Sequence, residues 1–404
     1  MAQGSTPGQR PGRANAPATT RVQLGIDREI AGSFQRLRGR RIGLVTNQTG
    51  VDGQGGFTRS ALKAGLGDGL KVLFGPEHGL DTRARAGARV ADSVDDVTGL
   101  PVRSLYGTTR KPTPAMLEGL DALVFDIQDI GIRSYTYIST MALCMEACGE
   151  AGIDFIVLDR PNPMGGERVQ GPPLEPRWTS FVGQVPVPYL HGLTVGELAR
   201  MIVGERWIRA LPRSLEVIAM EGWSRSMNWG ATRLGWVATS PNIPRWVSPY
   251  YCAATGILGE LRGVEIGVNS PEPFEVASAA GVNPRQLAAA LTRAFPTGVR
   301  FAPYTSTRSP GMAGVRLAID PNGGTDLMAL GVALVCEINA RARAGARPFE
   351  LTGATGIDLF KKAYGSEVLW DAVRAGAPWQ PLVTGWADSL AAFRTLRAPY
   401  LLYR

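Results

Sequence analysis

The chain has 404 residues, and its 44% hydrophobic and 19% charged content is ordinary for a globular protein. This length favours two domains over a single hydrophobic core. The formal net charge is +8, but the basic residues are mostly scattered arginines, and the densest cluster spans only residues 36–41. The sequence has no zinc-finger spacing and no homeodomain-like helix, so this charge does not predict a nucleic-acid partner.

The first 21 residues are small and polar and lack the apolar centre of a signal peptide. We expect residues 1–21 to form a disordered arm, either native or left after processing upstream. No apolar run is long enough to span a bilayer. The location is therefore left open: cytoplasmic as the chain stands, and periplasmic or secreted if an export signal has been removed. The sequence does not define an oligomeric state.

Four short apolar runs, each ending in polar and turn residues, cover residues 41–47, 71–79, 122–131 and 154–163. Helix-compatible stretches separate them, at residues 57–66 and 136–152 among others, and Thr194 with Glu197 forms a capping box that opens a further helix. Apolar strands that alternate with helices predict parallel strands covered on both faces. We therefore expect residues 22–210 to form a doubly wound α/β domain.

The second half of the chain has a less regular pattern. Strands are expected at residues 215–220 and 314–320, and helices at residues 283–295 and 326–343. We interpret residues 211–404 as a smaller α+β domain.

The four cysteines do not form a metal-binding pattern, because neither a second cysteine pair nor matching histidines accompany Cys144 and Cys148. We expect Cys144, Cys148, Cys252 and Cys336 to be buried free thiols. The sequence thus predicts no metal site.

Polar residues follow all four apolar runs of the predicted parallel sheet. In open α/β sheets, ligands bind beyond the carboxyl ends of the strands, so these residues are candidates for a common site. A turn alone would explain one such ending, but four in succession favour a site. The residues are Asn47, Gln48, Glu77, His78, Asp126, Asp129, Asp159, Arg160 and Asn162.

Glu77 is the most informative of these residues, because partial burial in a cleft would raise its pKa and suit it to general acid catalysis. Its neighbour His78 would bind substrate, orient the carboxylate, or form a structural hydrogen bond to the backbone. Asp126 and Asp129 face opposite sides if the strand continues, so at most one shares the cleft unless the chain turns at Gln128. The alternative for Asp126 is that it braces a loop. Two carboxylates suit glycoside hydrolysis, but also other hydrolytic or sugar-binding chemistry.

A longer series of motifs carries a family resemblance. GLVTNQTGVD (43–52), LFGPEHGL (73–80), LVFDIQDIGIRSYTYISTM (123–141), VLDRPNPMGG (157–166), HGLTVGELA (191–199) and SPNIP (240–244) occur in this order. Together they closely resemble the NamZ-type exo-β-N-acetylmuramidases, glycoside hydrolase family 171, over residues 24–404. The resemblance implies a Rossmann-like catalytic domain and a C-terminal domain that walls the cleft. It also implies release of N-acetylmuramic acid from the non-reducing end of peptidoglycan fragments in bacterial cell-wall turnover or recycling, without a cofactor.

The resemblance also implies site residues. The catalytic candidates are Glu77, His78, Asp126 and Asp129, with Glu77 as the acid/base carboxylate. The substrate-binding candidates are Asn47, Gln128, Arg133, Tyr135, Asp159, Arg160, Asn162 and His191. Arg133 or Arg160 would pair with the lactyl carboxylate of muramic acid, since a guanidinium can bind a carboxylate through two hydrogen bonds.

Two departures from the family pattern leave alternatives open. The family's V-E-G is Val169-Gln170-Gly171 in this chain, and the G-R-G-T segment is absent from residues 259–275, although Pro273-Phe274-Glu275 is kept. The first alternative is a catalytically altered or non-hydrolytic homologue that binds cell-wall sugar. The second is a hydrolase of another acidic sugar.

Overall fold

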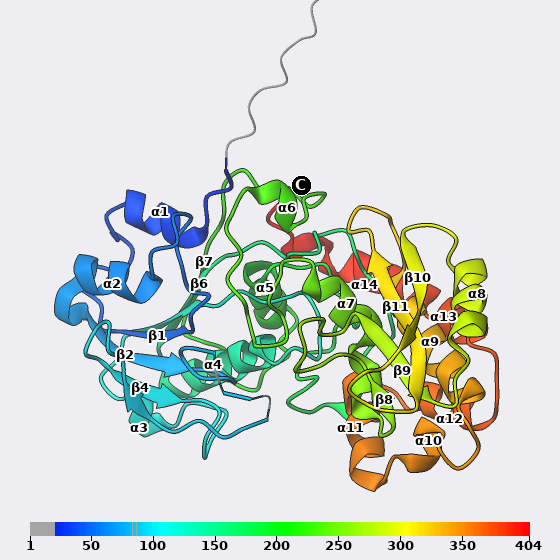
Figure 1. Ribbon diagram of the computed structural model, residues 1–404. Coiled ribbons are helices and arrows are strands. Elements are labelled where there is room, and N and C mark those ends of the chain that lie inside the picture. Colours follow the sequence, from blue (N-terminus) through cyan, green and yellow to red (C-terminus); the bar gives the residue numbers. More distant parts are fainter. Residues whose placement is uncertain (1–20, 83, 86) are drawn as a thin grey trace, which may run out of the picture.

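The computed structural model describes residues 21–82, 84–85 and 87–404, so the predicted arm, apart from Arg21, lies outside the described part. Within the described residues, a seven-stranded, mostly parallel sheet and a four-stranded antiparallel sheet occupy the two halves of the molecule (Figure 1). The fold is therefore mixed α/β, with a smaller second sheet in the C-terminal half.

The strands of the larger sheet lie in the order β3-β4-β2-β1-β5-β6-β7, and each neighbouring pair is parallel except β3 with β4. Their bounds are Ile42–Thr46 (β1), Leu70–Gly75 (β2), Ser93–Val94 (β3), Pro101–Ser104 (β4), Ala122–Asp126 (β5), Asp154–Leu158 (β6) and Leu215–Ile218 (β7). The four apolar runs form β1, β2, β5 and β6, which confirms these strands. Our placement of the strand at 215–220 in the second domain is wrong, because β7 pairs with β6 in this sheet.

Helices cover both faces of the larger sheet, and this explains why its central strands are apolar throughout. Successive residues of β1 face opposite sides: Leu44 packs in the cluster under α1 and α2, and Val45 packs in the cluster under α4 and α5. The helices are α1 (Gly25–Ala31), α2 (Thr58–Leu66), α3 (Pro114–Leu117), α4 (Tyr137–Ala151) and α5 (Val195–Gly204). The predicted capping box is present at the start of α5, where Glu197 donates its backbone N–H to the Thr194 hydroxyl oxygen at 3.1 Å.

The smaller sheet has the order β10-β11-β9-β8, with all neighbours antiparallel. Its strands are Val264–Glu265 (β8), Val276–Ala280 (β9), Val299–Thr305 (β10) and Met312–Ile319 (β11). The helices of this half and of the connection to it are α6 (Trp229–Thr232), α7 (Ser248–Thr255), α8 (Pro284–Ala294), α9 (Leu327–Arg341), α10 (Pro348–Leu351), α11 (Ala354–Tyr364), α12 (Val368–Arg374), α13 (Gln380–Thr384) and α14 (Ala387–Arg397). The 3₁₀ helices found in the described part of the chain are η1 (Gly67–Gly69), η2 (Pro176–Trp178), η3 (Gly256–Glu260) and η4 (Ala398–Tyr400).

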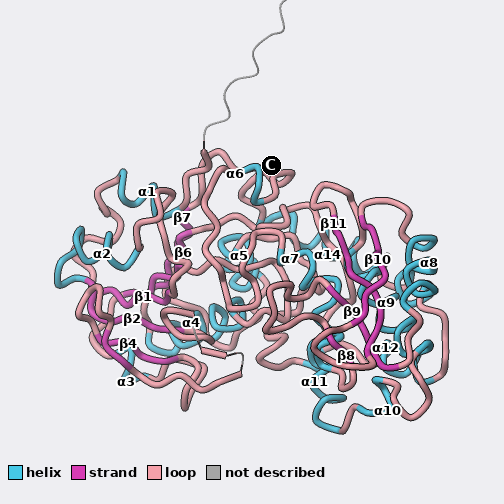
Figure 2. Tube along the Cα trace, in the orientation of Figure 1, coloured by secondary structure: helices cyan, strands magenta, loops and turns pink. Residues whose placement is uncertain are grey.

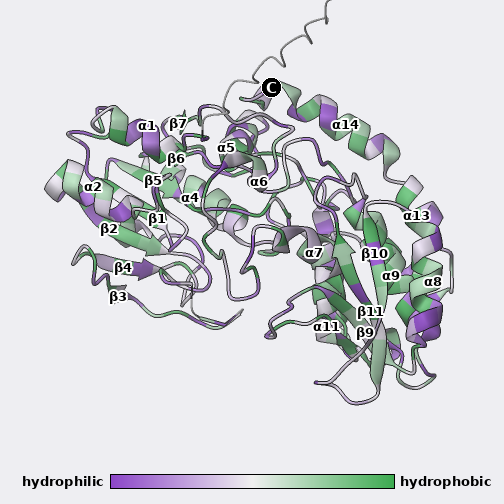
Figure 3. Ribbon diagram, turned by 45° about the horizontal axis from the view of Figure 1, so that its top comes forward, coloured by the Kyte–Doolittle hydropathy of each residue, from purple (hydrophilic) through white to green (hydrophobic). Residues whose placement is uncertain are grey.

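The helices α8 and α9 and the strand β11 confirm the elements predicted in the second half of the chain. Helix α8 is amphipathic and carries hydrophilic residues beside hydrophobic ones (Figure 3), because it buries only one face, with Leu287 and Leu291, against the sheet. Helix α9 is apolar on all sides and is buried over most of its length.

The two halves share a hydrophobic core and a network of polar contacts. One buried cluster runs from Phe125 and Phe155 of the larger sheet to Val315 and Leu334 of the second half. Much of the chain between the two sheets is loop (Figure 2), and loops held by a rigid scaffold often carry functional residues. No helix in the described part of the chain is long and apolar enough to cross a membrane.

Candidate active site

Glu77 lies in the turn that follows β2, at the carboxyl edge of the larger sheet, and its side chain is 8% exposed. One carboxylate oxygen accepts a hydrogen bond from the Gly87 N–H at 2.9 Å, and the other accepts one from the Thr136 hydroxyl at 2.6 Å. Burial, followed by the negative charge of Glu77, raises the pKa of Tyr106 to about 12. Within the described residues, Glu77 therefore accepts hydrogen bonds from two neutral donors, one at each carboxylate oxygen.

His78 adopts a left-handed backbone conformation, with φ of 70°, which is uncommon for a residue with a side chain. Its Nδ1 lies 2.7 Å from the Ala84 carbonyl oxygen, and the Ala84 N–H donates to the His78 carbonyl at 3.2 Å. Because a carbonyl oxygen only accepts, Nδ1 carries the proton of this bond. The backbone hydrogen bond considered from the sequence is thus present, and it fixes the ring beside Glu77.

Glu77 and His78 line a cavity of about 310 Å³, which we call the Glu77 cavity. The lining includes residues 132 and 134–137 after β5, and further residues between positions 252 and 274 of the second half. Residues 240, 242 and 243 also line it. Tyr135, a predicted substrate-binding residue, lines the cavity, and its hydroxyl lies 2.8 Å from the Thr239 hydroxyl. The cavity therefore lies between the two halves of the molecule.

The second carboxylate in this cavity is Glu260, at the end of η3, which the sequence analysis did not select. Burial raises the pKa of Glu260, and its carboxylate has no hydrogen-bond or ion-pair partner within the described part of the chain. The available signal was its position in GELRGVEIGVNSPEPFE, the segment that replaces a family motif. Nothing in the spacing of that segment indicates that Glu260 lines the same cavity as Glu77, 183 positions earlier, because only the fold brings the two segments together.

Asp126 and Arg160 form a buried ion pair and are absent from the described lining of the Glu77 cavity. The Arg160 Nε and Nη2 atoms lie 2.5 and 2.9 Å from the two carboxylate oxygens of Asp126, and Nη2 also donates to the Val51 carbonyl at 2.7 Å. The side chains are 0% and 2% exposed. This geometry matches the loop-bracing alternative for Asp126, and it occupies two nitrogens of Arg160 inside the protein.

Asp159 is completely buried and accepts three side-chain or backbone hydrogen bonds from other elements. Thr194 and Gly196 at the start of α5 donate at 2.8 Å each, and the Tyr403 hydroxyl of the C-terminal tail donates at 2.6 Å. Burial raises the pKa of Asp159 to about 6, although these donors oppose that rise. Its contacts fix the start of α5 and the C-terminal tail at the end of β6.

Asp129 differs from Asp126 and Asp159, in which both carboxylate oxygens accept hydrogen bonds. Its Oδ2 accepts from the Gly131 N–H at 2.6 Å, but its buried Oδ1 has no hydrogen-bond partner among the described residues. Burial raises the pKa of Asp129 to about 7. Burial is the main cause that raises the pKa of Tyr137; Tyr135 and the negative charges of Glu77 and Asp129 raise it further. The strand ends at Asp126, and the alternation assumed from the sequence does not extend to Asp129.

Four other predicted substrate-binding residues are buried inside the protein. The buried Arg133 donates to the carbonyls of Pro172, Val187 and Tyr364, at 2.9, 2.8 and 2.5 Å. His191 is 1% exposed, and burial lowers its pKa to about 3, so it is neutral. Asn47 accepts from Thr49 and braces the loop after β1, and Asn162 donates to the Leu193 carbonyl at 3.1 Å. None of Asn47, Arg133, Asn162 and His191 belongs to the described lining of the Glu77 cavity.

Gln170 lies outside the Glu77 cavity as well, in a separate depression shared with Arg168 and Arg394. Its Oε1 accepts from the Leu327 N–H, the first residue of α9, at 3.0 Å. Its backbone pairs with Leu190 in an isolated bridge. The side chain thus holds the start of α9, and the carboxylate lost at this position is not a partner that faces Glu77.

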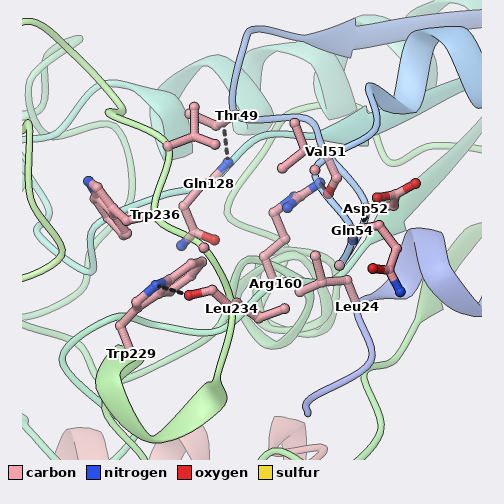
Figure 4. Close-up of a pocket in the computed structure, with 14 residues that line it drawn as sticks. Leu24, Thr49, Val51, Asp52, Gln54, Gln128, Arg160, Trp229, Leu234 and Trp236 are labelled. Carbon is pink, nitrogen blue, oxygen red and sulfur yellow. Dashed lines mark hydrogen bonds between the residues drawn. The ribbon is translucent and has the colours of Figure 1, made fainter.

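Gln128 and Arg160 face a second cavity, of about 180 Å³, at the carboxyl ends of β1, β5 and β6 (Figure 4). We call it the switch cavity. Its other walls are residues 51–55 after β1 and residues 229 and 234–237. The residues predicted at the carboxyl ends of the strands thus do not form one cleft. Some line one of the two cavities, and the others are buried and brace neighbouring loops and helices. Within the described residues, no group of three His, Cys, Asp or Glu side chains could hold a metal ion.

Comparison with solved structures supports the same architecture. A crystal structure of a DUF1343 family protein from Bacteroides fragilis NCTC 9343 is 38% identical in sequence, with a TM-score of 0.87, and the match covers 95% of this chain and 99% of that one. A second DUF1343 protein from the same organism is 25% identical, with a TM-score of 0.74 and the same coverage.

Sequence comparison identifies the family. Residues 42–247 match the N-terminal model of the exo-β-N-acetylmuramidase NamZ, and residues 250–403 match its C-terminal model. The peptidoglycan β-N-acetylmuramidase NamZ of Bacillus subtilis (strain 168) is 38% identical over 389 residues, which cover 95% of this chain and 92% of the relative. The sequence motifs, the architecture and these matches agree, and the chain belongs to the exo-β-N-acetylmuramidase NamZ family.

Proposed function

We propose that this protein is an exo-acting glycosidase that releases N-acetylmuramic acid from the non-reducing ends of peptidoglycan fragments, in cell-wall turnover or recycling. The observation that carries the proposal is the Glu77 cavity, where one carboxylate comes from each half of the molecule. Most glycoside hydrolases use two carboxyl groups, one on either side of the scissile bond. The family to which the chain belongs indicates that the sugar released is N-acetylmuramic acid.

The two carboxylates have different surroundings, and these suggest different roles. Glu260 lacks donors in the described part of the chain and has a pKa raised by burial, which suits a group that holds a proton and donates it to the leaving oxygen. Glu77 accepts hydrogen bonds at both oxygens, which suits the group that stabilises positive charge on the ring and takes a proton from the attacking water. The glycosidic C–O bond breaks as the water oxygen bonds to the anomeric carbon. His78 is the positioning residue beside Glu77.

The proposal also includes the finer description of the fold. The six parallel strands follow the order β4-β2-β1-β5-β6-β7, which corresponds to the order 3-2-1-4-5-6 of the Rossmann fold. We infer a Rossmann-like domain that ends after β7, near residue 248, and a C-terminal α+β domain that walls the Glu77 cavity. Asp129 is kept in the proposal as a buried carboxyl group outside the described lining of the Glu77 cavity, without direct contact with substrate.

The test uses the purified chain with the 4-nitrophenyl β-glycosides of N-acetylmuramic acid and N-acetylglucosamine. We expect nitrophenol release from the first compound only, and a loss of about 10²–10⁴-fold in kcat for Glu77→Gln. Cleavage of neither compound by the wild-type protein, together with saturable binding, would refute the hydrolase and favour a sugar-binding role. Cleavage of the N-acetylglucosamine compound alone would refute the muramic-acid specificity.

The assigned roles are tested by the leaving group. Nitrophenol needs little protonation, so Glu260→Gln should retain most activity on the aryl glycoside and lose it on a natural disaccharide, whereas Glu77→Gln should lose both. Glu265→Gln is the matched control, since Glu265 lies nearby on β8 but outside the described lining of the cavity. Equal losses on both substrates for Glu260→Gln would overturn the assignment of Glu260 as the acid.

A further inference from the structure

The switch cavity lies where the order of the strands changes direction. From β1, the strands β2 and β4 follow on one side and β5, β6 and β7 on the other, so the loops after β1 and β5 diverge. This divergence opens a crevice, and it is where doubly wound sheets bind their ligands. The cavity lies at this crevice, between residues 51–55 and Gln128, and its lining contains no described residue beyond position 237. It is therefore separate from the Glu77 cavity, which needs the second half of the molecule.

A buried polar atom points into the switch cavity without a protein partner. Gln128 is 3% exposed, and its Nε2 donates to the carbonyls of Asp129 and Pro161, at 2.7 and 2.8 Å. These two bonds fix the orientation of the amide and direct Oε1 toward the cavity (Figure 4). Oε1 has no hydrogen-bond partner in the described part of the chain. A buried acceptor left unpaired is costly, so this atom is a built receptor for a ligand N–H or O–H.

Arg160 adds a donor on the other side of the cavity. Its Nε and Nη2 atoms are engaged by Asp126 and by the Val51 carbonyl, which hold the guanidinium in one orientation. Nη1 has no hydrogen-bond partner among the residues described, and the side chain lines the cavity. The cavity therefore presents one acceptor and one oriented donor, which a vicinal pair of hydroxyl and amide groups can satisfy together.

Two tryptophans form the apolar wall. The Trp229 and Trp236 rings are 4.9 Å apart at 88°, and both line the cavity. Their indole N–H groups donate to the Leu234 and Ile243 carbonyls, at 3.2 and 3.3 Å, so these N–H groups are already engaged. Trp229 is 5% exposed, whereas Trp236 is half-buried and is the ring with more surface open to a ligand. Indole faces beside a few oriented polar groups suit a pyranose ring, which has apolar C–H faces and a polar edge.

The charge and size of the cavity further restrict the class of ligand that fits it. Among the described lining residues, Arg160 and Asp52 are the charged ones, and the charge of Arg160 is already balanced by Asp126. Among these lining residues, an anionic sugar would thus meet the negative charge of Asp52, and Arg160 would offer it no unbalanced positive charge. The volume of about 180 Å³ is below the range of about 300–1,000 Å³ for drug-sized ligands, so a single ring is the appropriate size.

We propose that the switch cavity binds one neutral N-acetylhexosamine ring, such as N-acetylglucosamine, at a site distinct from the Glu77 cavity. The existence of a sugar site follows from the cavity itself, and the choice of an acetamido sugar depends on the proposed function. The ring stacks on Trp236, a hydroxyl or amide N–H donates to Gln128 Oε1, and Arg160 Nη1 donates to a sugar oxygen.

The test is a binding titration of the full-length Glu77→Gln protein with N-acetylglucosamine, followed by saturation-transfer NMR. We expect Gln128→Leu, which removes the acceptor at similar volume, to weaken binding about tenfold. Trp236→Ala, at a half-buried position, should weaken it similarly, and Trp178→Phe, outside the cavity, should leave Kd unchanged. N-acetylmuramic acid should compete weakly for this site.

Several outcomes overturn the inference. If binding persists in Gln128→Leu and Trp236→Ala but is lost in Tyr135→Ala, the sugar binds in the Glu77 cavity instead. Absence of binding, or tighter competition by N-acetylmuramic acid, would refute the neutral-sugar site. The proposed function can fail independently of this inference. If the wild-type protein hydrolyses no muramic-acid glycoside but binds N-acetylglucosamine in the switch cavity, the hydrolase is refuted and the sugar site is retained.

Discussion

Glu77 and Asp126 both stand at the carboxyl edge of the larger sheet, but their surroundings differ in charge. Asp126 faces the Arg160 guanidinium at 2.5–2.9 Å in a fully buried ion pair, whereas Glu77 accepts hydrogen bonds from the neutral groups of Gly87 and Thr136 beside a cavity. A carboxylate neutralised by a buried cation is part of the framework, because separating the pair is costly. A carboxylate held by neutral donors beside open space remains available to a ligand.

The largest expected effect on stability comes from breaking the buried pair. Asp126→Asn leaves Arg160 charged and buried, and we expect the free energy of unfolding to fall by about 3–5 kcal/mol. Glu77→Gln should change it by less than about 1 kcal/mol, since an amide can keep the hydrogen bond from Gly87. Urea denaturation of Asp126→Asn and Glu77→Gln measures this difference in the free energy of unfolding.

Asp121 provides the control at the opposite end of the same strand. It also binds an arginine, Arg41, at 2.7 Å, but this pair is exposed, with side chains 33% and 54% accessible. We expect Asp121→Asn to cost no more than about 1 kcal/mol. If Asp126→Asn is as stable as Asp121→Asn and yet inactive, Asp126 has a role in activity like Glu77. The distinction between a structural Asp126 and a reactive Glu77 would then be wrong.

An intermediate effect is expected from Asp129, whose pKa is raised to about 7 by burial. Because the folded state holds this proton more tightly than the unfolded state, the stabilising contribution is complete below pH 4 and is lost as the pH rises through 7. A rise of roughly 3 units corresponds to about 4 kcal/mol over that range, as an upper estimate.

The variant Asp129→Asn should flatten this dependence, since an amide keeps the hydrogen bond from Gly131 but does not titrate. Thermal unfolding at pH 5 and pH 7.5 would show a smaller difference in Tm for the variant than for the wild type. Asp159, with a pKa raised to about 6, contributes in the same direction and remains in both proteins. An unchanged difference in Tm would mean that Asp129 is ionised in the folded state and is better grouped with Glu77.

The elements that sequence reasoning predicted well are those with strong local signals. The apolar runs of β1, β2, β5 and β6 and the capping box of α5 are visible in a few consecutive residues. The strand β7 was harder to place, because its partly exposed edge position gives no information about which sheet it joins. Sequence period indicates a strand, but partner choice depends on contacts that are distant in the chain.

The site was predicted in part for the same reason. Position at the end of a parallel strand marks Glu77, Asp126 and Asp159 alike, and it does not show which of them faces a cation, a set of donors or a cavity. The sequence did not point to Glu260, whose catalytic role is a proposal, because only the folded chain places η3 and the turn after β2 at the same cavity. Charge pairing and cavity lining are properties of the folded chain, so local pattern alone does not separate framework residues from reactive ones.

The smallest effect is expected from restoring the family carboxylate with Gln170→Glu. The Gln170 Oε1 already accepts from the Leu327 N–H at the start of α9, and a glutamate can keep this bond where the helix dipole favours negative charge. Only the contact of Nε2 with the Thr325 carbonyl, at 3.5 Å, would be lost. We expect less than about threefold change in kcat/KM and less than about 1 kcal/mol in stability.

Gln170→Ala is the matched variant, because it removes the acceptor at the start of α9 without adding charge. If both variants change only stability, position 170 supports the junction between the two halves, and the loss of its carboxylate does not impair hydrolysis. A gain of a hundredfold or more with Gln170→Glu would show that the position acts on substrate. In that case the boundary of the active site would extend from the Glu77 cavity to the depression around Arg168, and cavity lining in the free protein would be an insufficient criterion for a catalytic carboxylate.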